Sequence, residues 1–253
     1  MSRRAIITGA SSGIGEAVAR ELVRRGWSVV LLARRVDLLE RLANELAPNA
    51  TAVACDVTDG AAVKRAAEAH GPYDLAVANA GISVPTFAID FNAADAEAIM
   101  RVNVLGMFYL FDAVVPAMIA RRSGRFAGVA SIAGFRGLPS SSVYSASKAA
   151  MQAFLEASRC ELAASGVGVT TINPGWVETP IVDKYEGKMP FLVPVDRAAR
   201  IIVDGLERGA SEIEFPLPMV LLTRGLRFLP KAIFDPLGRW YAKRHINLDK
   251  VRR

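Results

Sequence analysis

A glycine-rich turn near the amino terminus constrains the fold of this 253-residue chain more than any other feature. An apolar run at residues 5–7 predicts a strand, the turn from Thr8 to Gly15 follows it, and residues 16–25 have a helical composition. A second predicted strand at 28–32 completes a βαβ unit. Glycines let a backbone approach a pyrophosphate, and the N-terminus of a helix attracts its negative charge. The turn residues expected to line this phosphate site are Gly9, Ser11, Ser12, Gly13, Ile14 and Gly15.

Short apolar runs and helical stretches alternate along the rest of the chain. The further predicted strands are residues 50–54, 75–78, 126–130, 167–172 and 212–215, and the longer helical stretches are 93–122, 143–164 and 195–208. Such alternation is typical of parallel sheets. We therefore predict an α/β fold, a Rossmann-like doubly wound parallel sheet of about seven strands with helices on both faces. Because 52% of the residues are apolar, the chain can bury one large core, and residues 1–216 are expected to form a single domain.

A second pattern, formed by Ser131, Tyr144 and Lys148, predicts a reaction centre. If residues 143–164 are helical, Tyr144 and Lys148 lie four residues apart on one face of the helix. A free tyrosine has a pKa of about 10, and a nearby ammonium favours its phenolate, so we expect Lys148 to lower the pKa of Tyr144. Ser131 follows a predicted strand, where its hydroxyl can hold a substrate oxygen. These three residues are the first candidates for catalysis.

Together these residues resemble the motifs of the short-chain dehydrogenase/reductase family, in kind and in order. The resemblance covers most of the chain, and it implies the family's strand order, 3-2-1-4-5-6-7. The matching segments are the TGxxxGxG turn from Thr8 to Gly15, Asp56-Val57, Asn79-Ala80-Gly81, Asn103, Ser131, Tyr144 with Lys148, and Pro174-Gly175 with Val177 and Thr179 after it.

The resemblance also implies roles for single residues. Asp56 and Val57 would contact the adenine, Asn103 would hold a water in a proton relay, and Lys148 would also bind the nicotinamide ribose. The segments expected to bind the cofactor, besides the glycine turn, are Asn79-Ala80-Gly81, Tyr144 and Lys148, and Pro174, Gly175, Val177 and Thr179. The implied activity is that of an NAD(P)-dependent oxidoreductase, which interconverts a carbonyl and an alcohol by hydride transfer.

The end of the second predicted strand indicates which dinucleotide is preferred. NAD-specific sites place a carboxylate there to bind the ribose 2′-hydroxyl, whereas this chain has Arg34 and Arg35. A guanidinium binds a 2′-phosphate through paired charged hydrogen bonds. We therefore expect NADP(H) to be preferred over NAD(H), with Arg34 as the main contact and Arg35 assisting. Ser12 departs from the pattern, since many NADP-preferring relatives have a basic residue at its position.

Two other classes of function are compatible with parts of the sequence. Residues 9–13 also match GxSxG, the nucleophile elbow of α/β hydrolases. A hydrolase would need a histidine late in the chain at a strand end, and neither His70 nor His245 fits that position, so this alternative is disfavoured. A non-catalytic dinucleotide-binding sensor or scaffold remains open, because cofactor binding does not require turnover.

The substrate and the assembly are less constrained by sequence. The family places its substrate lid at residues 179–194, where Tyr185, Met189, Phe191 and Leu192 favour an apolar carbonyl or alcohol substrate. The other wall of the pocket is expected at Gly134, Phe135, Leu138 and Val143. The resemblance further implies a homodimer or homotetramer, formed through the helices at 93–122 and 143–164.

Composition narrows the compartment and the ligands. The first strand begins within five residues of Met1, and no run of eighteen apolar residues is present, so we expect a cytoplasmic protein without a signal peptide. The chain has two cysteines, Cys55 and Cys160, which do not form a disulfide or metal-binding pattern. We therefore expect no metal ligand. No nucleic-acid recognition motif is present, so no nucleic acid is expected as a partner.

The positive charge of the chain is concentrated in its last 37 residues. Residues 217–253 contain nine Lys or Arg and two Asp, a net charge of +7, whereas residues 1–216 carry a net charge of −1. Apolar residues recur at helical spacing, and we expect Pro230 and Pro236 to divide the segment into short helices, the last from Pro236 to about His245. We predict a basic, amphipathic helical extension that packs on or near the active site. It could also make weak peripheral contact with an anionic membrane.

Overall fold

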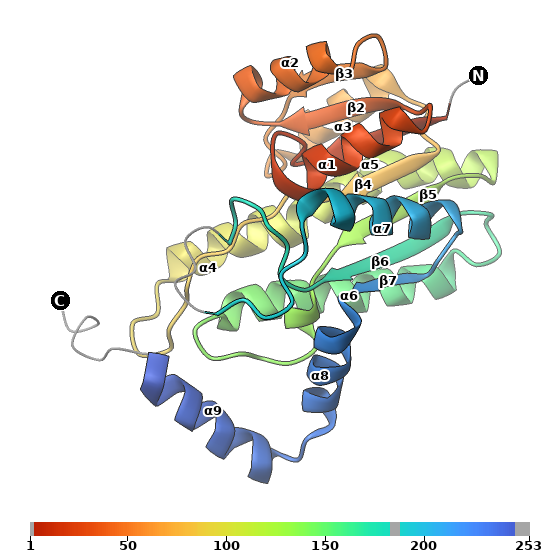
Figure 1. The fold of residues 1–253 in the computed structure, drawn as a ribbon. Coiled ribbons are helices and arrows are strands. Elements are labelled where there is room, and N and C mark those ends of the chain that lie inside the picture. Colours follow the sequence, from red (N-terminus) through yellow and green to blue (C-terminus); the bar gives the residue numbers. More distant parts are fainter. Residues whose placement is uncertain (1–2, 183–187, 246–253) are drawn as a thin grey trace.

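The computed structural model describes residues 3–182 and 188–245, and within them seven strands form one parallel sheet (Figure 1). Their order is β3-β2-β1-β4-β5-β6-β7. The strands are β1 (Arg4–Thr8), β2 (Ser28–Ala33), β3 (Ala50–Ala54), β4 (Leu75–Ala78), β5 (Arg125–Val129), β6 (Gly168–Pro174) and β7 (Glu212–Phe215). The predicted doubly wound sheet and its strand order are therefore confirmed.

Two layers of helices cover the two faces of the sheet and bury nearly continuous apolar strands. One layer contains α1 (Gly13–Arg24), α2 (Val36–Glu45) and α7 (Val195–Glu207). The other contains α3 (Gly60–His70), α5 (Gly106–Arg121) and α6 (Ser142–Glu161). Because side chains alternate along a strand, Ile7 faces the first layer and Ile6 the second, and both are fully buried.

The helical stretch predicted at 93–122 is present, but it is not a regular α-helix. It consists of α4 (Ala93–Met100), a π-helical turn at Arg101–Leu105, and α5. In this turn the Gly106 amide donates to the Arg101 carbonyl, five residues back. Ala93–Arg121 contains an 18-residue window with a mean hydropathy of 1.8 and is the one helix in the described part of the chain that is long and apolar enough to cross a membrane. Half of its most apolar window is buried inside the fold, where Phe111 packs edge-on against Phe126 and Phe154.

All seven strands run in the same direction, so their carboxyl ends meet along one edge of the sheet. The glycine turn follows β1 at this edge, and Arg34 and Arg35 follow β2. The segments after β3, β4, β5 and β6 begin with Cys55, Asn79, Ala130 and Gly175. The fold therefore brings the predicted site segments together along one edge, although they are separated by up to 170 residues in sequence.

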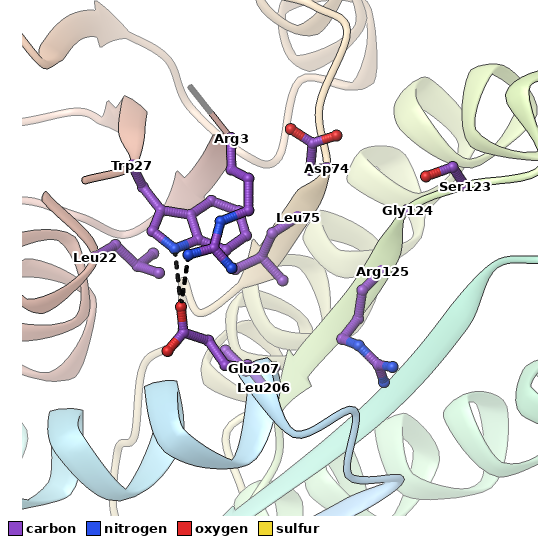
Figure 2. A pocket seen from close by; sticks show the side chains of 10 residues that line it. All are labelled: Arg3, Leu22, Trp27, Asp74, Leu75, Ser123, Gly124, Arg125, Leu206 and Glu207. Carbon is purple, nitrogen blue, oxygen red and sulfur yellow. Dashed lines mark hydrogen bonds and ion pairs between the residues drawn. The ribbon is translucent and has the colours of Figure 1, made fainter. Parts of the chain in front are cut away.

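The opposite edge of the sheet carries a cavity of about 220 Å³, which none of the predicted site residues lines (Figure 2). Arg3, Trp27, Asp74, Arg125 and Glu207 line it, together with neighbouring residues at the amino ends of β1, β4 and β5. The cavity therefore lies away from the reaction centre predicted from sequence.

After β7 the chain forms two further helices, α8 (Leu217–Phe228) and α9 (Lys231–His245). The helix α8 extends away from the sheet, and the chain then bends into α9, which runs in a different direction (Figure 1). The break predicted at Pro230 is present, but the predicted start of the last helix at Pro236 is wrong. The amides of Ile233 and Phe234 donate to the Pro230 carbonyl, so the first turn forms five residues earlier than expected. Pro236 lies inside α9, where it leaves the carbonyl four residues back without its helical partner.

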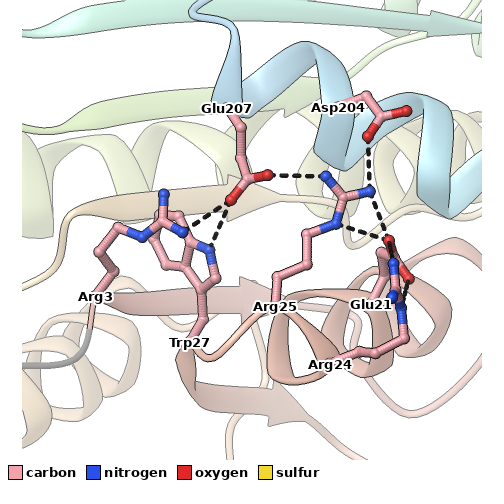
Figure 3. A network of polar contacts seen from close by, with 7 residues as sticks. All are labelled: Arg3, Glu21, Arg24, Arg25, Trp27, Asp204 and Glu207. Carbon is pink, nitrogen blue, oxygen red and sulfur yellow. Dashed lines mark hydrogen bonds and ion pairs between the residues drawn. The ribbon is translucent and has the colours of Figure 1, made fainter.

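Charged residues join α1 to α7 across the first helix layer (Figure 3). The Arg25 guanidinium lies 2.6 Å from Glu21, 2.7 Å from Asp204 and 2.8 Å from Glu207. Glu21 is only 8% exposed, and it also accepts hydrogen bonds from Arg24. Hydrogen bonds from Arg24 and then Arg25 lower the pKa of the Glu21 carboxyl to about 2.

This low pKa predicts an acid-dependent contribution to stability. A carboxyl whose folded pKa is depressed stabilises the fold above its unfolded pKa, and this contribution is lost as the pH falls through the folded pKa. We expect Glu21→Gln to lower the free energy of unfolding by about 2 kcal/mol near neutral pH, and by almost nothing near pH 2. Urea denaturation of both proteins across this pH range measures the difference. Glu97→Gln, which changes an exposed pair with Arg101, is the matched control, and a wild-type to Glu21→Gln difference that does not change with pH would contradict the assignment.

Candidate active site

The turn after β1 forms a tight backbone cradle at the N-terminus of α1. Gly9 has a φ of +66°, and a Cβ atom on it would lie 2.7 Å from the Ala80 Cα. A Cβ atom on Gly15 would lie 2.5 Å from the Gly9 carbonyl oxygen and closer still to the Asn79 amide. Ser12, at the N-cap of α1, makes no side-chain capping bond. The first amides of α1 are therefore not capped by Ser12, and they suit a bound anion.

Thr8 and Asn79 hold this cradle against the turn after β4. The Asn79 side chain donates to the carbonyls of Thr8 at 3.0 Å and Gly9 at 3.2 Å. In return, the Thr8 hydroxyl accepts from the backbone amides of Asn79 and Ala80. Asn79 and Ala80 thus fix the shape of the glycine turn, and Gly81 beside them lies next to the Lys148 ammonium.

Arg34 and Arg35 lie at the end of β2 and point to different neighbours. Arg35 donates to the hydroxyls of Ser11 and Ser12, so it lies over the glycine turn. Arg34 is exposed and lies 3.8 Å from Asp56. Hydrogen bonds from Thr58, first from its backbone amide, hold the pKa of Asp56 below its usual value. Asp56 is therefore a carboxylate at neutral pH, next to Val57, which is buried against the second helix layer.

Ser131 and Tyr144 meet at the ends of β5 and α6. The Ser131 hydroxyl accepts from the Ala133 amide at 3.1 Å and lies 3.3 Å from the Pro174 carbonyl, to which it can donate. The Ser131 hydroxyl also lies close enough to the Tyr144 phenol to influence its pKa. Because α6 begins at Ser142, Tyr144 and Lys148 lie in its first two turns, with the Lys148 ammonium 5.6 Å from the centre of the tyrosine ring.

Lys148 is buried without a carboxylate in hydrogen-bonding contact in the described part of the chain. Its ammonium donates to the Val129 carbonyl at 2.7 Å and lies 3.6 Å from the Met151 sulfur. Burial lowers the pKa of Lys148 to about 7, because a buried charge loses its hydration. At neutral pH the side chain therefore carries only part of a positive charge.

The expected lowering of the tyrosine pKa is not found. Burial raises the pKa of Tyr144, and the nearby Ser131 hydroxyl offsets this effect only in part. The prediction that Lys148 lowers the pKa of Tyr144 is wrong for this structure, because burial acts on the phenol and on the ammonium together. A phenol with a raised pKa is protonated at neutral pH, which suits a proton donor.

Asn103 lies in the π-helical turn and is fully buried. Its side chain accepts from the Ile82 amide at 2.8 Å and donates to the Ile82 carbonyl at 3.1 Å and to the Ser147 hydroxyl at 3.0 Å. Ser147 in turn donates to the Tyr144 carbonyl. The side chain of Asn103 thus joins the loop after β4 to the first turn of α6, beside the tyrosine.

The turn after β6 closes the site on its last side. The Gly175 amide donates to the Phe215 carbonyl at 2.7 Å, and the Thr179 hydroxyl donates to the Val177 carbonyl. Thr179 also lies against Gly13, so this turn touches the glycine cradle. Val177 pairs with Val193, which brings the end of the predicted lid back to Pro174 and Gly175. Of the predicted lid residues, Tyr185 lies outside the described part of the chain.

Gln152 is a residue at this site that the sequence patterns did not single out. Its amide donates to the Ser131 carbonyl and to the Asn173 side chain, both at 2.8 Å. It lies four residues after Lys148 and eight after Tyr144, on the same face of α6, and this spacing is the signal that could have identified it. Gln152 fixes the backbone that carries the Ser131 hydroxyl.

The hydrolase alternative does not fit this geometry. Ser11 and Ser12 contact Arg35 rather than a histidine. His70 ends α3 and lies beside Arg4 and Ser28, at the opposite edge of the sheet. The other histidine is His245, whose side chain lies outside the described residues. Within residues 3–182 and 188–245, no three His, Cys, Asp or Glu side chains gather in a way that could hold a metal ion.

Comparison with known proteins gives the same family as the motifs. The profile of the family described as short chain dehydrogenase matches residues 3–189. An uncharacterized oxidoreductase of Myxococcus xanthus is 39% identical over 94% of this chain and 96% of its own length. A dehydrogenase/reductase SDR family protein 7-like of Anopheles gambiae is 41% identical, over 70% of this chain and 59% of its own length.

Solved structures of similar proteins share the fold over almost the whole chain. A short chain dehydrogenase from Burkholderia cenocepacia in complex with NADP superposes with a TM-score of 0.83 at 28% identity, and covers 93% of this chain and 97% of its own. A short chain dehydrogenase/reductase from Burkholderia phymatum in complex with NAD has a TM-score of 0.82 at 25% identity, covering 89% and 92%. With the site geometry, these matches show that the chain belongs to the short-chain dehydrogenase/reductase family and is an oxidoreductase.

Proposed function

We propose that this enzyme interconverts a carbonyl and an alcohol on an apolar small molecule, with NADP(H) as the preferred cofactor. The observation that carries the proposal is the placement of the Tyr144 phenol beside Ser131 and Lys148, at the same sheet edge as the glycine cradle. The α/β hydrolase alternative has no histidine at this edge in the described residues, and a non-catalytic sensor would not turn over.

The residues present fit a nicotinamide dinucleotide. The backbone at Gly9 and Gly15 has no room for a Cβ atom, and the N-terminus of α1 is not capped by Ser12, as a pyrophosphate site requires. Lys148 is a buried ammonium beside Gly81 that could donate to ribose hydroxyls. Asp56 and Val57 would contact the adenine, and Pro174, Gly175, Val177 and Thr179 would contact the nicotinamide. Relatives of this chain bind NAD or NADP.

The proton transfer follows from the placement of three side chains. The bound cofactor supplies or accepts the hydride at the substrate carbon. In the reductive direction Tyr144 gives its phenolic proton to the carbonyl oxygen, and Ser131 donates a hydrogen bond to the same oxygen. Ribose hydroxyls that accept hydrogen bonds from Lys148 would favour its charged form, and the ammonium would then stabilise the phenolate that results. Asn103 holds the loop after β4 against α6, next to the path by which the phenol regains its proton.

Tyr144→Phe tests this assignment directly, because the ring remains and only the transferable proton is removed. We expect kcat to fall by about a hundredfold or more, the usual contribution of a general acid, while NADPH binding changes little. Nicotinamide absorbance measures turnover, and cofactor fluorescence measures binding. Tyr73→Phe removes a buried phenol that donates to the Ala67 carbonyl and serves as the matched control. Near wild-type turnover in Tyr144→Phe would refute the role of the tyrosine.

The preference for NADP(H) is supported by the two arginines after β2. Arg35 already covers the glycine turn. Among the described residues Arg34 is held only by an exposed pair with Asp56, which costs little to break. Both guanidinium groups are therefore placed to bind the 2′-phosphate of NADP(H). The chain has no carboxylate at positions 34 and 35 that would repel one.

Charge reversal at these positions is expected to change the cofactor preference. Arg34→Asp should lower kcat/KM with NADPH by about a hundredfold, the effect of losing a charged pair, and should change kcat/KM with NADH by only a few-fold. Arg35→Asp should act in the same direction, and Arg41→Asp, on the exposed face of α2, is the control. Equal losses with both cofactors would contradict a 2′-phosphate contact.

The substrate and the assembly are proposed from exposed apolar surface. Ile181, Phe191 and Leu192, in the lid segment predicted to cover the substrate, are 49%, 58% and 39% exposed. They favour a hydrophobic ketone, aldehyde or secondary alcohol over a sugar. Leu105 and Ile119, on the π-turn and α5, are exposed as well, which supports a homodimer or homotetramer formed through these helices and α6. We also propose that the enzyme is cytoplasmic.

The C-terminal helices support weak attachment to an anionic membrane. In α8, Leu221 and Phe228 are 62% and 81% exposed, and in α9 Ile233 and Leu237 are 51% and 50% exposed. Residues 217–245 contain six Lys or Arg and one Asp, a net charge of +5, so two copies of this surface would repel each other, whereas an anionic bilayer would attract them.

Liposome co-sedimentation tests this contact. We expect the wild-type protein to bind anionic vesicles at low salt and to dissociate at high salt, because the attraction is screened. Ile233→Ser with Leu237→Ser should reduce binding about tenfold, and Ile89→Ser, an exposed apolar residue before α4, is the control. A folded wild-type protein that does not bind at low salt would leave only the packing role of the tail.

A further inference from the structure

Arg136 connects the segment after Ser131 to both C-terminal helices. One of its guanidinium nitrogens donates to the carbonyls of Leu226, Arg227 and Leu229, at 2.8, 2.9 and 2.9 Å. These carbonyls belong to the end of α8, where a helix lacks internal partners and where its dipole favours a cation. The three contacts therefore cap the C-terminus of α8 from outside the helix.

The same guanidinium also holds the beginning of α9. It lies over the ring of Phe234, 3.9 Å from the ring centre, in the geometry of a cation–π contact. Between the capped end of α8 and Phe234 lies the corner that contains Pro230. A single side chain thus fixes the corner from both sides, which sets the direction in which α9 leaves α8.

The other end of this connection is the candidate reaction centre. Arg136 lies five residues after Ser131, and Ile132 and Phe135 between them pack against Met219 and Val220 of α8. Trp176, which follows the turn at Pro174 and Gly175, packs in the same cluster. The helix α8 therefore lies against both segments that flank the proposed carbonyl site.

A second chain of contacts joins α8 to Ser131 through β7, β6 and α6. Arg224 of α8 pairs with Glu214 at 2.9 Å, and Glu214 accepts from Asn173 at 3.2 Å. Gln152 then links Asn173 to the Ser131 carbonyl. The backbone that presents the serine hydroxyl is thus tied to α8 through β7, β6 and α6, in addition to its direct connection through Arg136.

We propose that Arg136 is a positioning residue, which docks α8 and α9 against the Ser131 segment and so makes them a fixed wall of the substrate site. This proposal rests on the proposed carbonyl chemistry. A small substrate held by Ser131 and Tyr144 needs no such wall. A long apolar substrate extends beyond the reacting carbon, and it would lose binding when the wall is free to move.

The experiment compares Arg136→Ala, Arg136→Lys and a control, Arg227→Ala, which removes a guanidinium from the end of α8 but keeps the carbonyls that Arg136 binds. In Arg136→Ala we expect trypsin to cleave after Lys231 about tenfold faster, because the start of α9 is no longer held. Mass spectrometry of the fragments over time measures the cleavage rate. We expect the KM of a long-chain methyl ketone to rise about tenfold, the scale of losing a hydrogen bond to a charged group. The KM values of a short methyl ketone and NADPH, and kcat with the short ketone, should stay within about twofold.

Arg136→Lys should be intermediate, because an ammonium keeps the charge but not the planar fork that stacks on an aromatic ring. Unchanged cleavage in Arg136→Ala would overturn the docking of the tail. Faster cleavage with equal changes, or no change, for the two ketones would overturn the role in substrate positioning. If the wild-type enzyme turns over neither ketone, the proposed substrate class fails, whereas the cleavage result still decides whether Arg136 docks the tail.

Discussion

The close approach of two turns, after β1 and after β4, is the constraint on which the rest of this structure depends. Gly9 and Gly15 leave no space for a side chain, and the Asn79 amide fills the gap between them with two hydrogen bonds. This contact fixes the N-terminus of α1 at the carboxyl edge of the sheet. The other segments at that edge, after β5 and β6, are held against the cradle by parallel strand pairing and by Thr179.

Burial, rather than pairing of charges, sets the acid–base character of the proposed reaction centre. The same desolvation that raises the pKa of Tyr144 lowers that of Lys148 to about 7. Burial thus disfavours the charged form of both groups. Any bound group that accepts hydrogen bonds from the ammonium would favour its charged form, and would through it favour the phenolate.

The architecture could be predicted from sequence because each of its signals is local. The apolar runs at β4 and β5 and the glycine turn predict strands and their connections, and the chain order of the motifs predicts the sheet. The catalytic candidates lie at one edge because parallel strands bring their carboxyl ends together. The predicted start of the last helix at Pro236 is wrong because the Pro230 carbonyl, six residues earlier, accepts the first helical bonds.

Other features depend on tertiary contacts that no local pattern contains. The direction of the pKa shift of Tyr144 follows from burial by segments far away in sequence, and Gln152 acquires its partners only when β5 and β6 lie side by side. Arg136 has an unremarkable sequence context, and its importance comes from the carbonyls that α8 presents ninety residues later. Composition can show that a tail is basic and amphipathic, but not which side chain anchors it.

The π-helical turn at Arg101–Leu105 has a consequence for how this helix can change in length. A π-turn accommodates one residue more than an α-helical turn of the same rise. Deleting a single residue there would restore a regular α-helical turn, and the helix after it would keep its orientation. Leu110 and Met118, which pack in the core, would therefore stay buried. The extra residue thus serves the site rather than the core, because a deletion here would move Asn103 away from Ile82 and Ser147 and leave the packing of α5 intact.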